Sequence, residues 1–256
     1  MVERWNVTIP SLTGDRPRKA YVYLPVGYEE ETDRRYPVMY MYDGHNLFSD
    51  EEATYGKSWG LADYLDYTET KVIIAAVECN TVGHGRLEEY TPVSFTFKDG
   101  TFINAKGKKY MDWLVKEFKP YIDGHYRTLP DRENTALGGS SMGGLMTLYS
   151  LLKYGKYFSK GAALSPSLWV NGGSTVQEFL QGCTLRKNTY IYMDYGSCEF
   201  DRHLPQRRAF AETCAELIER GAFVTSRVVA GGTHCEASWE RQIPYFMSAL
   251  GFDPEK

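Results

Sequence analysis

A serine flanked by glycines, between two apolar runs, constrains this sequence most strongly. The segment Gly139-Ser140-Ser141-Met142-Gly143 follows the apolar run 135–137 and precedes an amphipathic run over 145–154. A strand, a sharp turn and a helix in that order are the setting in which G-x-S-x-G lifts a serine hydroxyl above the edge of a sheet. The two glycines relieve the crowding of a strained turn. Because Ser140 has no glycine two residues after it, the pattern predicts Ser141 as the nucleophile.

Strands and helices alternate along most of the chain. An opening pair of strands is predicted over 5–10 and 18–25, around a turn at 13–15. Further strands are predicted, besides the one before Ser141, over 37–42, 71–77, 159–164, 189–195 and 223–229. Besides the helix after Ser141, helices are predicted over 59–67, 110–122, 204–221 and 238–250. This order predicts an α/β fold with a mostly parallel central sheet, helices on both faces and an antiparallel N-terminal edge.

The predicted domain organisation is a single domain over residues 1–256. The length suits one large α/β domain or two small ones, and no repeat or low-complexity linker divides the chain. Two stretches break the alternation, at about 79–107 and 166–187, and the first holds several glycines among aromatic residues. Long irregular segments in a domain of this kind are commonly functional, so we expect both insertions to shape a binding pocket.

Composition narrows the classes of partner. A formal net charge of −4 argues against nucleic acid and anionic membranes, and no apolar run is long enough to span a bilayer. The first residues lack a basic segment followed by an apolar one, so no secretion signal is expected. Five cysteines without a C-x-x-C pair are typical of reduced thiols. We therefore expect a cytoplasmic protein with a small-molecule or carbohydrate partner. The sequence does not distinguish a monomer from a homo-oligomer.

Three loops after predicted strands carry groups suited to nucleophilic catalysis. Ser141 follows one strand, Glu199 and Asp201 follow the strand over 189–195, and His234 follows the strand over 223–229. Loops at the carboxyl ends of parallel strands meet at one edge of an open sheet. The chain order serine, acid, histidine is that of α/β-hydrolases.

The role of each group follows from proton chemistry. A serine hydroxyl is a weak nucleophile until a neutral imidazole accepts its proton, and a buried carboxylate orients that imidazole. His234 is the predicted base, since the remaining histidines lack its position after a strand in the correct order: His45, His84, His125 and His203. Glu199 and Asp201 are both candidates for the acid, and Glu199 is preferred.

The tetrahedral intermediate of acyl transfer needs two backbone donors for its oxyanion. The N–H of Met142, directly after the nucleophile, and the N–H of His45, in the loop after the strand over 37–42, are predicted to supply them. Trp169, Asp43 and Tyr90 are the predicted substrate-binding residues, because they lie in or beside the irregular and post-strand segments.

Five segments carry a resemblance to a known family. They are YDGHNLF at 42–48, RLEEYTP at 86–92, GGSSMGGL at 138–145, SPSLW at 165–169 and DYGSCE at 194–199. Together they resemble the esterase D, enterochelin esterase and feruloyl esterase branch of the α/β-hydrolases. The resemblance implies an α/β-hydrolase fold, hydrolysis of carboxylic esters without a metal or organic cofactor, and the roles of nucleophile, acid and base on Ser141, Glu199 and His234.

The chain departs from that branch at two positions. Relatives commonly have threonine where Ser197 stands before the acid, and often glutamine where His45 follows Asp-Gly. The second change alters the floor of the pocket but not the backbone donor.

The resulting prediction is a serine esterase that acts through an acyl-enzyme, on feruloyl or acetyl esters of carbohydrates. Two alternatives use the same trio, a siderophore (enterochelin-type) esterase and an acyltransferase or peptidase. A third is a catalytically inactive relative that binds a glycan or a siderophore.

Overall fold

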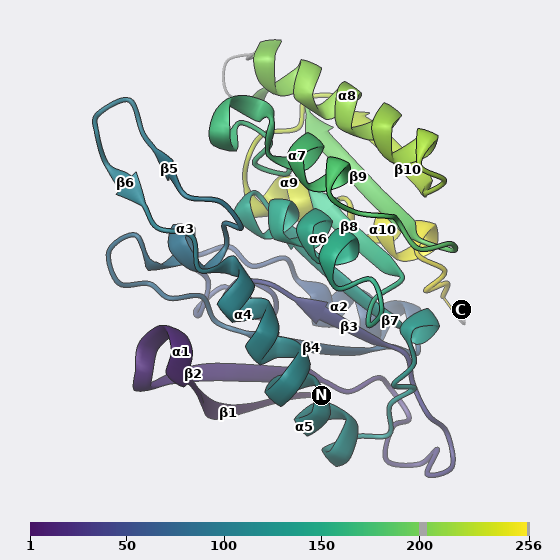
Figure 1. Cartoon of the computed structure of the whole chain (residues 1–256). Coiled ribbons are helices and arrows are strands. Elements are labelled where there is room, and N and C mark those ends of the chain that lie inside the picture. The colour runs from purple at the N-terminus through teal and green to yellow at the C-terminus, as the bar shows by residue number, and fades with distance from the viewer. Residues whose placement is uncertain (200–203, 255–256) are drawn as a thin grey trace.

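An eight-stranded sheet with helices against both faces forms the protein (Figure 1). The computed structural model describes residues 1–199 and 204–254. The strands of the sheet are β1 (Val2–Ile9), β2 (Gly14–Tyr23), β3 (Val38–Met41), β4 (Ile73–Val77), β7 (Thr135–Ser140), β8 (Lys160–Leu164), β9 (Tyr190–Gly196) and β10 (Phe223–Val229), and a separate hairpin consists of β5 (Phe95–Thr96) and β6 (Phe102–Ile103). The helical segments are α1 (Pro10–Thr13), η1 (Gly44–Asn46), α2 (Leu61–Thr68), α3 (Gly85–Glu89), α4 (Gly107–Trp113), η2 (Leu114–Phe118), α5 (Lys119–His125), η3 (Arg132–Asn134), α6 (Met142–Lys153), η4 (Val170–Gly173), α7 (Thr175–Gln181), α8 (Leu204–Glu219), α9 (Glu236–Glu240) and α10 (Ile243–Ala249).

The strand order across the sheet is β1-β2-β4-β3-β7-β8-β9-β10. The β1–β2 and β2–β4 pairs are antiparallel, and the pairs from β4 to β10 are all parallel. This arrangement confirms the predicted fold class, a mostly parallel sheet with an antiparallel N-terminal edge. It also brings the loops after β3, β7, β8, β9 and β10 to one edge of the sheet, because parallel strands end on the same side.

The central strands are buried on both faces, which explains their continuous apolar runs. Side chains of β4 alternate between two hydrophobic clusters, with Ile73, Ala75 and Val77 in one and Ile74 and Ala76 in the other. Residues of α4, α5, α6, α7 and α8 complete the first cluster, and residues of α2, α9 and α10 complete the second. None of the helices in the described part of the chain is long and apolar enough to cross a lipid bilayer.

Three segments differ from the prediction. The single helix expected over 238–250 is two helices, because Pro244 lies at the start of α10. Proline has no N–H for the preceding turn but is tolerated at the first positions of a new helix. The insertion at 79–107 contains α3 and the β5–β6 hairpin, and the one at 166–187 contains η4 and α7, so neither is irregular throughout.

Candidate active site

Ser141 occupies the sharp turn between β7 and α6. Its backbone has φ 57° and ψ −117°, a region that costs a residue with a side chain about 1–3 kcal/mol. A Cβ on Gly139 or on Gly143 would lie 3.0 Å from the Cβ of Tyr42, so side chains at these two positions would crowd the turn. The predicted strand, turn and helix are therefore present, and the turn presents the Ser141 hydroxyl at the carboxyl edge of the sheet.

The turn after β3 is held by an ion pair between buried Asp43 and half-buried Arg86. Both carboxylate oxygens of Asp43 accept hydrogen bonds from Arg86, each at 2.7 Å. Burial disfavours the ionised carboxyl group, but the charge and hydrogen bonds of Arg86 outweigh it and keep the pKa of Asp43 below its usual value. The Asp43 N–H donates to the hydroxyl of Tyr90, which is fully buried. Asp43 and Tyr90, predicted to bind substrate, both support this turn in the structure.

This turn packs against the turn that carries Ser141. The Tyr42 N–H donates to the carbonyl oxygen of Gly138 at 2.9 Å. Among residues 1–199 and 204–254, no acceptor takes the backbone N–H of Met142 or of His45. An N–H in the first turn of a helix, like that of Met142, has no partner within the helix. Both N–H groups thus lack an acceptor among these residues, and their role as oxyanion donors stays a prediction.

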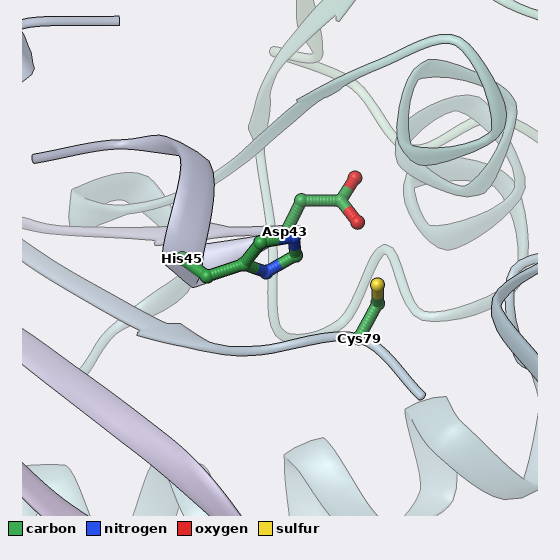
Figure 2. Close-up of side chains that lie close together, drawn as sticks. All are labelled: Asp43, His45 and Cys79. Carbon is green, nitrogen blue, oxygen red and sulfur yellow. The ribbon is translucent and has the colours of Figure 1, made fainter. Parts of the chain in front are cut away.

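Two residues of this turn, Asp43 and His45, lie close to the buried Cys79, as Figure 2 shows. One ligand-type atom from each lies within 4.8 Å of the others. Burial raises the pKa of the Cys79 thiol far above its usual value and lowers the pKa of the His45 imidazole, so both are neutral near pH 7. A metal ion here would have to displace the Arg86 guanidinium from Asp43. The cluster is an ion pair with two neutral neighbours.

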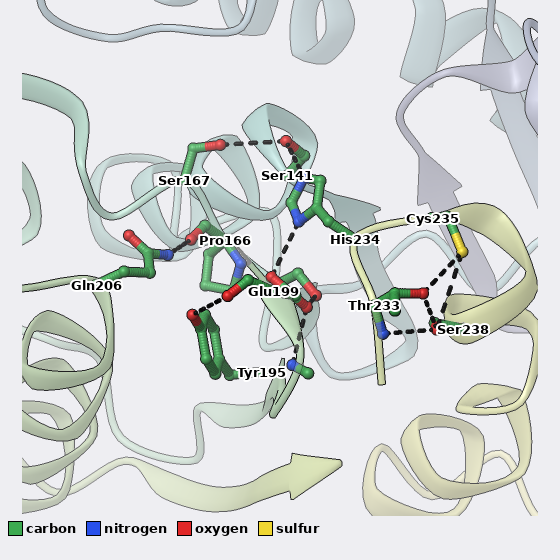
Figure 3. Close-up of polar contacts among 12 residues, drawn as sticks. Ser141, Pro166, Ser167, Tyr195, Glu199, Gln206, Thr233, His234, Cys235 and Ser238 are labelled. Carbon is green, nitrogen blue, oxygen red and sulfur yellow. Dashed lines mark hydrogen bonds and ion pairs between the residues drawn. The ribbon is translucent and has the colours of Figure 1, made fainter. Parts of the chain in front are cut away.

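The His234 ring lies between Ser141 and Glu199 (Figure 3). Its Nε2 is 2.9 Å from the Ser141 Oγ, and its Nδ1 is 3.0 Å from the Glu199 Oε2. The Glu199 side chain is 1% exposed and that of His234 is 22% exposed, so the acid is shielded while the imidazole reaches solvent. The structure therefore brings together the three groups that the sequence placed on separate loops. Asp201, the other candidate acid, lies outside the described residues.

The remaining described histidines make other contacts. The Nε2 of His45 is 2.9 Å from the Thr54 hydroxyl, and the Nδ1 of His125 is 2.8 Å from the carbonyl oxygen of Tyr121. His84 is exposed in the segment before α3, and His203 lies outside the described residues.

The segment after β8 adds contacts that the sequence did not reveal. The Ser167 Oγ is 3.2 Å from the Ser141 Oγ, and the Gln206 Nε2 donates to the carbonyl oxygen of Pro166 at 2.7 Å. The Ser165 hydroxyl donates to Glu199. The sequence signals for Ser165 and Ser167 were their place after a strand at the same edge of the sheet and the segment SPSLW, and neither gave the serines a particular role.

A groove of about 810 Å³ lies beside this site rather than over it. Three aromatic rings form its apolar part, with the Trp169 ring centroid 5.6 Å from that of Phe95 and 5.8 Å from that of Phe97. Gln206 also lines the groove and, through Pro166 and Ser167, connects it to Ser141. Of the three residues predicted to bind substrate, Trp169 is the one that lines this groove.

Comparison with known proteins identifies relatives of most of the chain. Uncharacterized protein YbbA of Bacillus subtilis (strain 168) is 24% identical over 188 residues, 71% of this chain and 69% of that protein. An endo-1,4-beta-xylanase/feruloyl esterase of Xylanibacter ruminicola is 25% identical over 254 residues, 96% of this chain but only 31% of that protein. The solved structure of an IroE-like serine hydrolase from Shewanella oneidensis has a TM-score of 0.73 and 20% identity, covering 93% of this chain and 76% of the other, which shows a shared fold.

A family model gives the assignment. The model described as "Putative esterase" matches residues 11–248, nearly the full length of the sequence. The match includes the turn at Ser141 and the loops that carry Glu199 and His234. The chain therefore belongs to this esterase family.

Proposed function

We propose that this protein hydrolyses carboxylic esters through an acyl-enzyme intermediate on Ser141. The observation that carries the proposal is the His234 imidazole, which lies 2.9 Å from a serine oxygen on one side and 3.0 Å from a buried carboxylate oxygen on the other. Both distances are within hydrogen-bond range. A hydroxyl, a base and an orienting acid in this relation are the minimum set for nucleophilic acyl transfer.

The hydrogen-bond network assigns the protons. The Nδ1–H of His234 donates to Glu199, which leaves the lone pair of Nε2 facing the Ser141 hydroxyl. As the Ser141 oxygen attacks the ester carbonyl carbon, Nε2 accepts the hydroxyl proton, and the Glu199 carboxylate stabilises the imidazolium. The N–H groups of Met142 and His45 would donate to the oxyanion of the tetrahedral intermediate.

Collapse of that intermediate completes the first half of the reaction. The carbon–oxygen bond to the alcohol breaks, and His234 returns its proton to the departing alkoxide oxygen. Water then attacks the acyl-enzyme while His234 again accepts a proton. The second tetrahedral intermediate releases the carboxylic acid and restores the Ser141 hydroxyl.

The choice of acid is tested by two substitutions assayed side by side. Glu199→Gln is expected to lower kcat for p-nitrophenyl acetate by about 10²–10⁴-fold, because an amide next to Nδ1 favours the wrong imidazole tautomer. Asp201→Asn is expected to stay within about threefold of wild type, because the proposal assigns the imidazole contact to Glu199 and not to Asp201. A large loss in Asp201→Asn with full activity in Glu199→Gln would reverse the assignment, and equally small losses in both would remove Glu199 and Asp201 from the mechanism.

We further propose an aromatic acyl group, such as a hydroxycinnamoyl group on a carbohydrate, as the part of the substrate that occupies the groove. Trp169, Phe95 and Phe97 offer flat apolar surfaces for stacking on a ring. The relative from Xylanibacter ruminicola, whose name includes feruloyl esterase, matches over 96% of this chain. Both observations favour an ester of an aromatic acid over a plain acetyl ester.

Trp169→Ala tests this part of the proposal. It is expected to reduce kcat/KM for methyl ferulate by about 10-fold relative to p-nitrophenyl acetate, since only methyl ferulate has an aromatic acyl group that would lose its ring contact and buried area at Trp169. Phe102→Ala is the control. Phe102 is an exposed ring on the β5–β6 hairpin that carries Phe95, and it does not line the groove. Equal losses for both esters, or a similar effect of Phe102→Ala, would contradict an aryl-binding groove.

A further inference from the structure

We propose that Ser165 is a positioning residue that holds the Glu199 carboxylate in the orientation His234 requires. The inference rests on the proposed roles of Ser141, His234 and Glu199. Ser165 directly follows β8 and is 2% exposed, so its side chain is enclosed by the protein. It lies at the same edge of the sheet as the loop after β9 that carries Glu199.

The two oxygens of the Glu199 carboxylate have separate partners. Oε1 accepts the Ser165 hydroxyl at 2.6 Å and the Gly196 N–H at 2.8 Å. Oε2 is 3.0 Å from the His234 Nδ1. An O–H to O distance of 2.6 Å is in the range of charge-assisted hydrogen bonds to a carboxylate. Two donors on Oε1 fix the plane of the carboxylate and direct Oε2 towards the imidazole.

The direction of the Ser165 hydroxyl is set by Trp239. The indole N–H of Trp239 is 3.0 Å from the Ser165 Oγ. Because an indole N–H can only donate, the Ser165 oxygen accepts there, and its single proton is left for Glu199. The Trp239 ring also packs edge to face against His234, with centroids 5.1 Å apart. Trp239 therefore donates to Ser165 and Ser165 donates to Glu199, which on its other oxygen accepts from the ring that Trp239 itself supports; accepting from Trp239 strengthens the bond that Ser165 donates.

The backbone conformation at Ser165 would suit glycine better than serine. Its φ is 43°, in the left-handed region that glycine adopts without strain. The Ser165 N–H donates to the Asp194 Oδ1 at 2.9 Å and to the Asp194 carbonyl oxygen at 3.2 Å, and these bonds hold the strained turn. A glycine could make the same backbone bonds with less strain, so the contribution particular to serine is its hydroxyl.

Two substitutions separate the hydroxyl from the turn. Ser165→Ala removes the hydroxyl and keeps the strain, while Ser165→Gly removes the hydroxyl and relieves the strain. Both are expected to lower kcat for p-nitrophenyl acetate about 10- to 100-fold with KM within about twofold, the loss of one hydrogen bond to a charged group. Ser159→Ala is the matched control: Ser159 is a buried serine just before β8, and its hydroxyl has no partner among the described residues.

The pH profile distinguishes positioning from a structural role. Without the Ser165 hydroxyl, the Glu199 carboxylate is held less firmly against the imidazolium and stabilises it less, so the acid limb of kcat/KM should move to lower pH in both Ser165 variants. Trp239→Phe keeps a ring and removes its N–H, and it should move the limb in the same direction with a smaller loss of kcat. Damage to the fold would instead lower the amplitude of the profile without moving the limb.

Wild-type kcat in Ser165→Gly, or an unmoved acid limb in a variant that is as stable as wild type, would overturn the positioning role. If Ser165→Ala does not fold, Ser165→Gly decides, and if neither folds, the Trp239→Phe profile decides. Full activity of the Ser165 variants, with Ser141→Ala inactive, would refute the positioning role of Ser165 but not the proposed function. An active Ser141→Ala would refute the proposed function itself.

Discussion

Ser141→Ala is expected to reduce the turnover of p-nitrophenyl acetate by at least about 10³-fold. The substitution removes the attacking oxygen, and neither the imidazole of His234 nor the backbone donors can form the acyl-enzyme without it. Initial rates measured at equal active protein concentration give the fold-change. A fluorophosphonate probe should label the wild-type protein and not the variant, because the probe reacts with an activated serine oxygen.

Ser140→Ala is the control for this experiment. Ser140 is the adjacent serine at the end of β7, is 6% exposed and is not one of the three proposed groups. It should keep its labelling and stay within about threefold of the wild-type rate. Turnover near the wild-type rate in Ser141→Ala would remove Ser141 from the mechanism. A wild-type protein that neither labels nor hydrolyses esters would favour a binding protein that has kept the fold without the chemistry.

Asp194→Asn is expected to make the protein more stable than wild type above neutral pH. Asp194 lies on β9 and is 1% exposed; burial raises the pKa of its carboxyl group to about 7, and the nearby charge of Glu199 adds to this effect. Hydrogen bonds from the Ser165 N–H and the Tyr192 hydroxyl oppose the rise without cancelling it. An asparagine side chain keeps an oxygen for the Ser165 N–H, its NH2 group can donate to the Tyr192 hydroxyl while that hydroxyl donates to Gln242, and it carries no charge to bury.

The sign of the pH dependence follows from linkage. The pKa of Asp194 is higher in the folded protein than its ordinary value of 3.8, so its contribution to stability is complete below about pH 4 and is lost as the pH rises through about 7. This pKa difference corresponds to about 4 kcal/mol in the free energy of unfolding. In Asp194→Asn that loss should be absent, and the two stability curves should diverge between about pH 4 and pH 7.

Urea unfolding of the wild type and the variant at several values between pH 4 and pH 8 measures the divergence. Asp15→Asn is the control, because Asp15 is exposed on β2 and its loss should leave the pH dependence of wild type unchanged. Parallel curves for wild type and Asp194→Asn would show that the buried carboxyl group does not titrate in this range.

The fold could be predicted because local patterns determine it. Each central strand is a continuous apolar run, since helices cover both faces of the sheet, and the turn at Ser141 needs glycines at fixed offsets. Ser141, Glu199 and His234 could be chosen together because parallel strands end on one side, so residues far apart in the sequence share an edge. The break between α9 and α10 was also encoded, in Pro244, although the helical pattern on either side obscured it.

The support of the site could not be predicted, because it depends on side chains that meet only in the folded protein. Ser165 contacts a residue 34 positions away and Trp239 contacts a residue 74 positions away. No periodicity or motif connects such pairs. Tyr90 shows the reverse case: an aromatic residue in a glycine-rich insertion suggested a pocket wall, but its ring is fully buried and its hydroxyl is used by the backbone of the turn after β3.

The aromatic rings of the groove come from two segments that are not part of the eight-stranded sheet. Phe95 and Phe97 come from the hairpin that extends away from the rest of the molecule in Figure 1, and Trp169 comes from the segment after β8. The three groups proposed to react stand instead on the loops after β7, β9 and β10 of the sheet. In the proposed function, substrate selection and bond cleavage thus have separate architectural foundations, and a lineage could exchange the hairpin to accept a new acid while inheriting the chemistry unchanged.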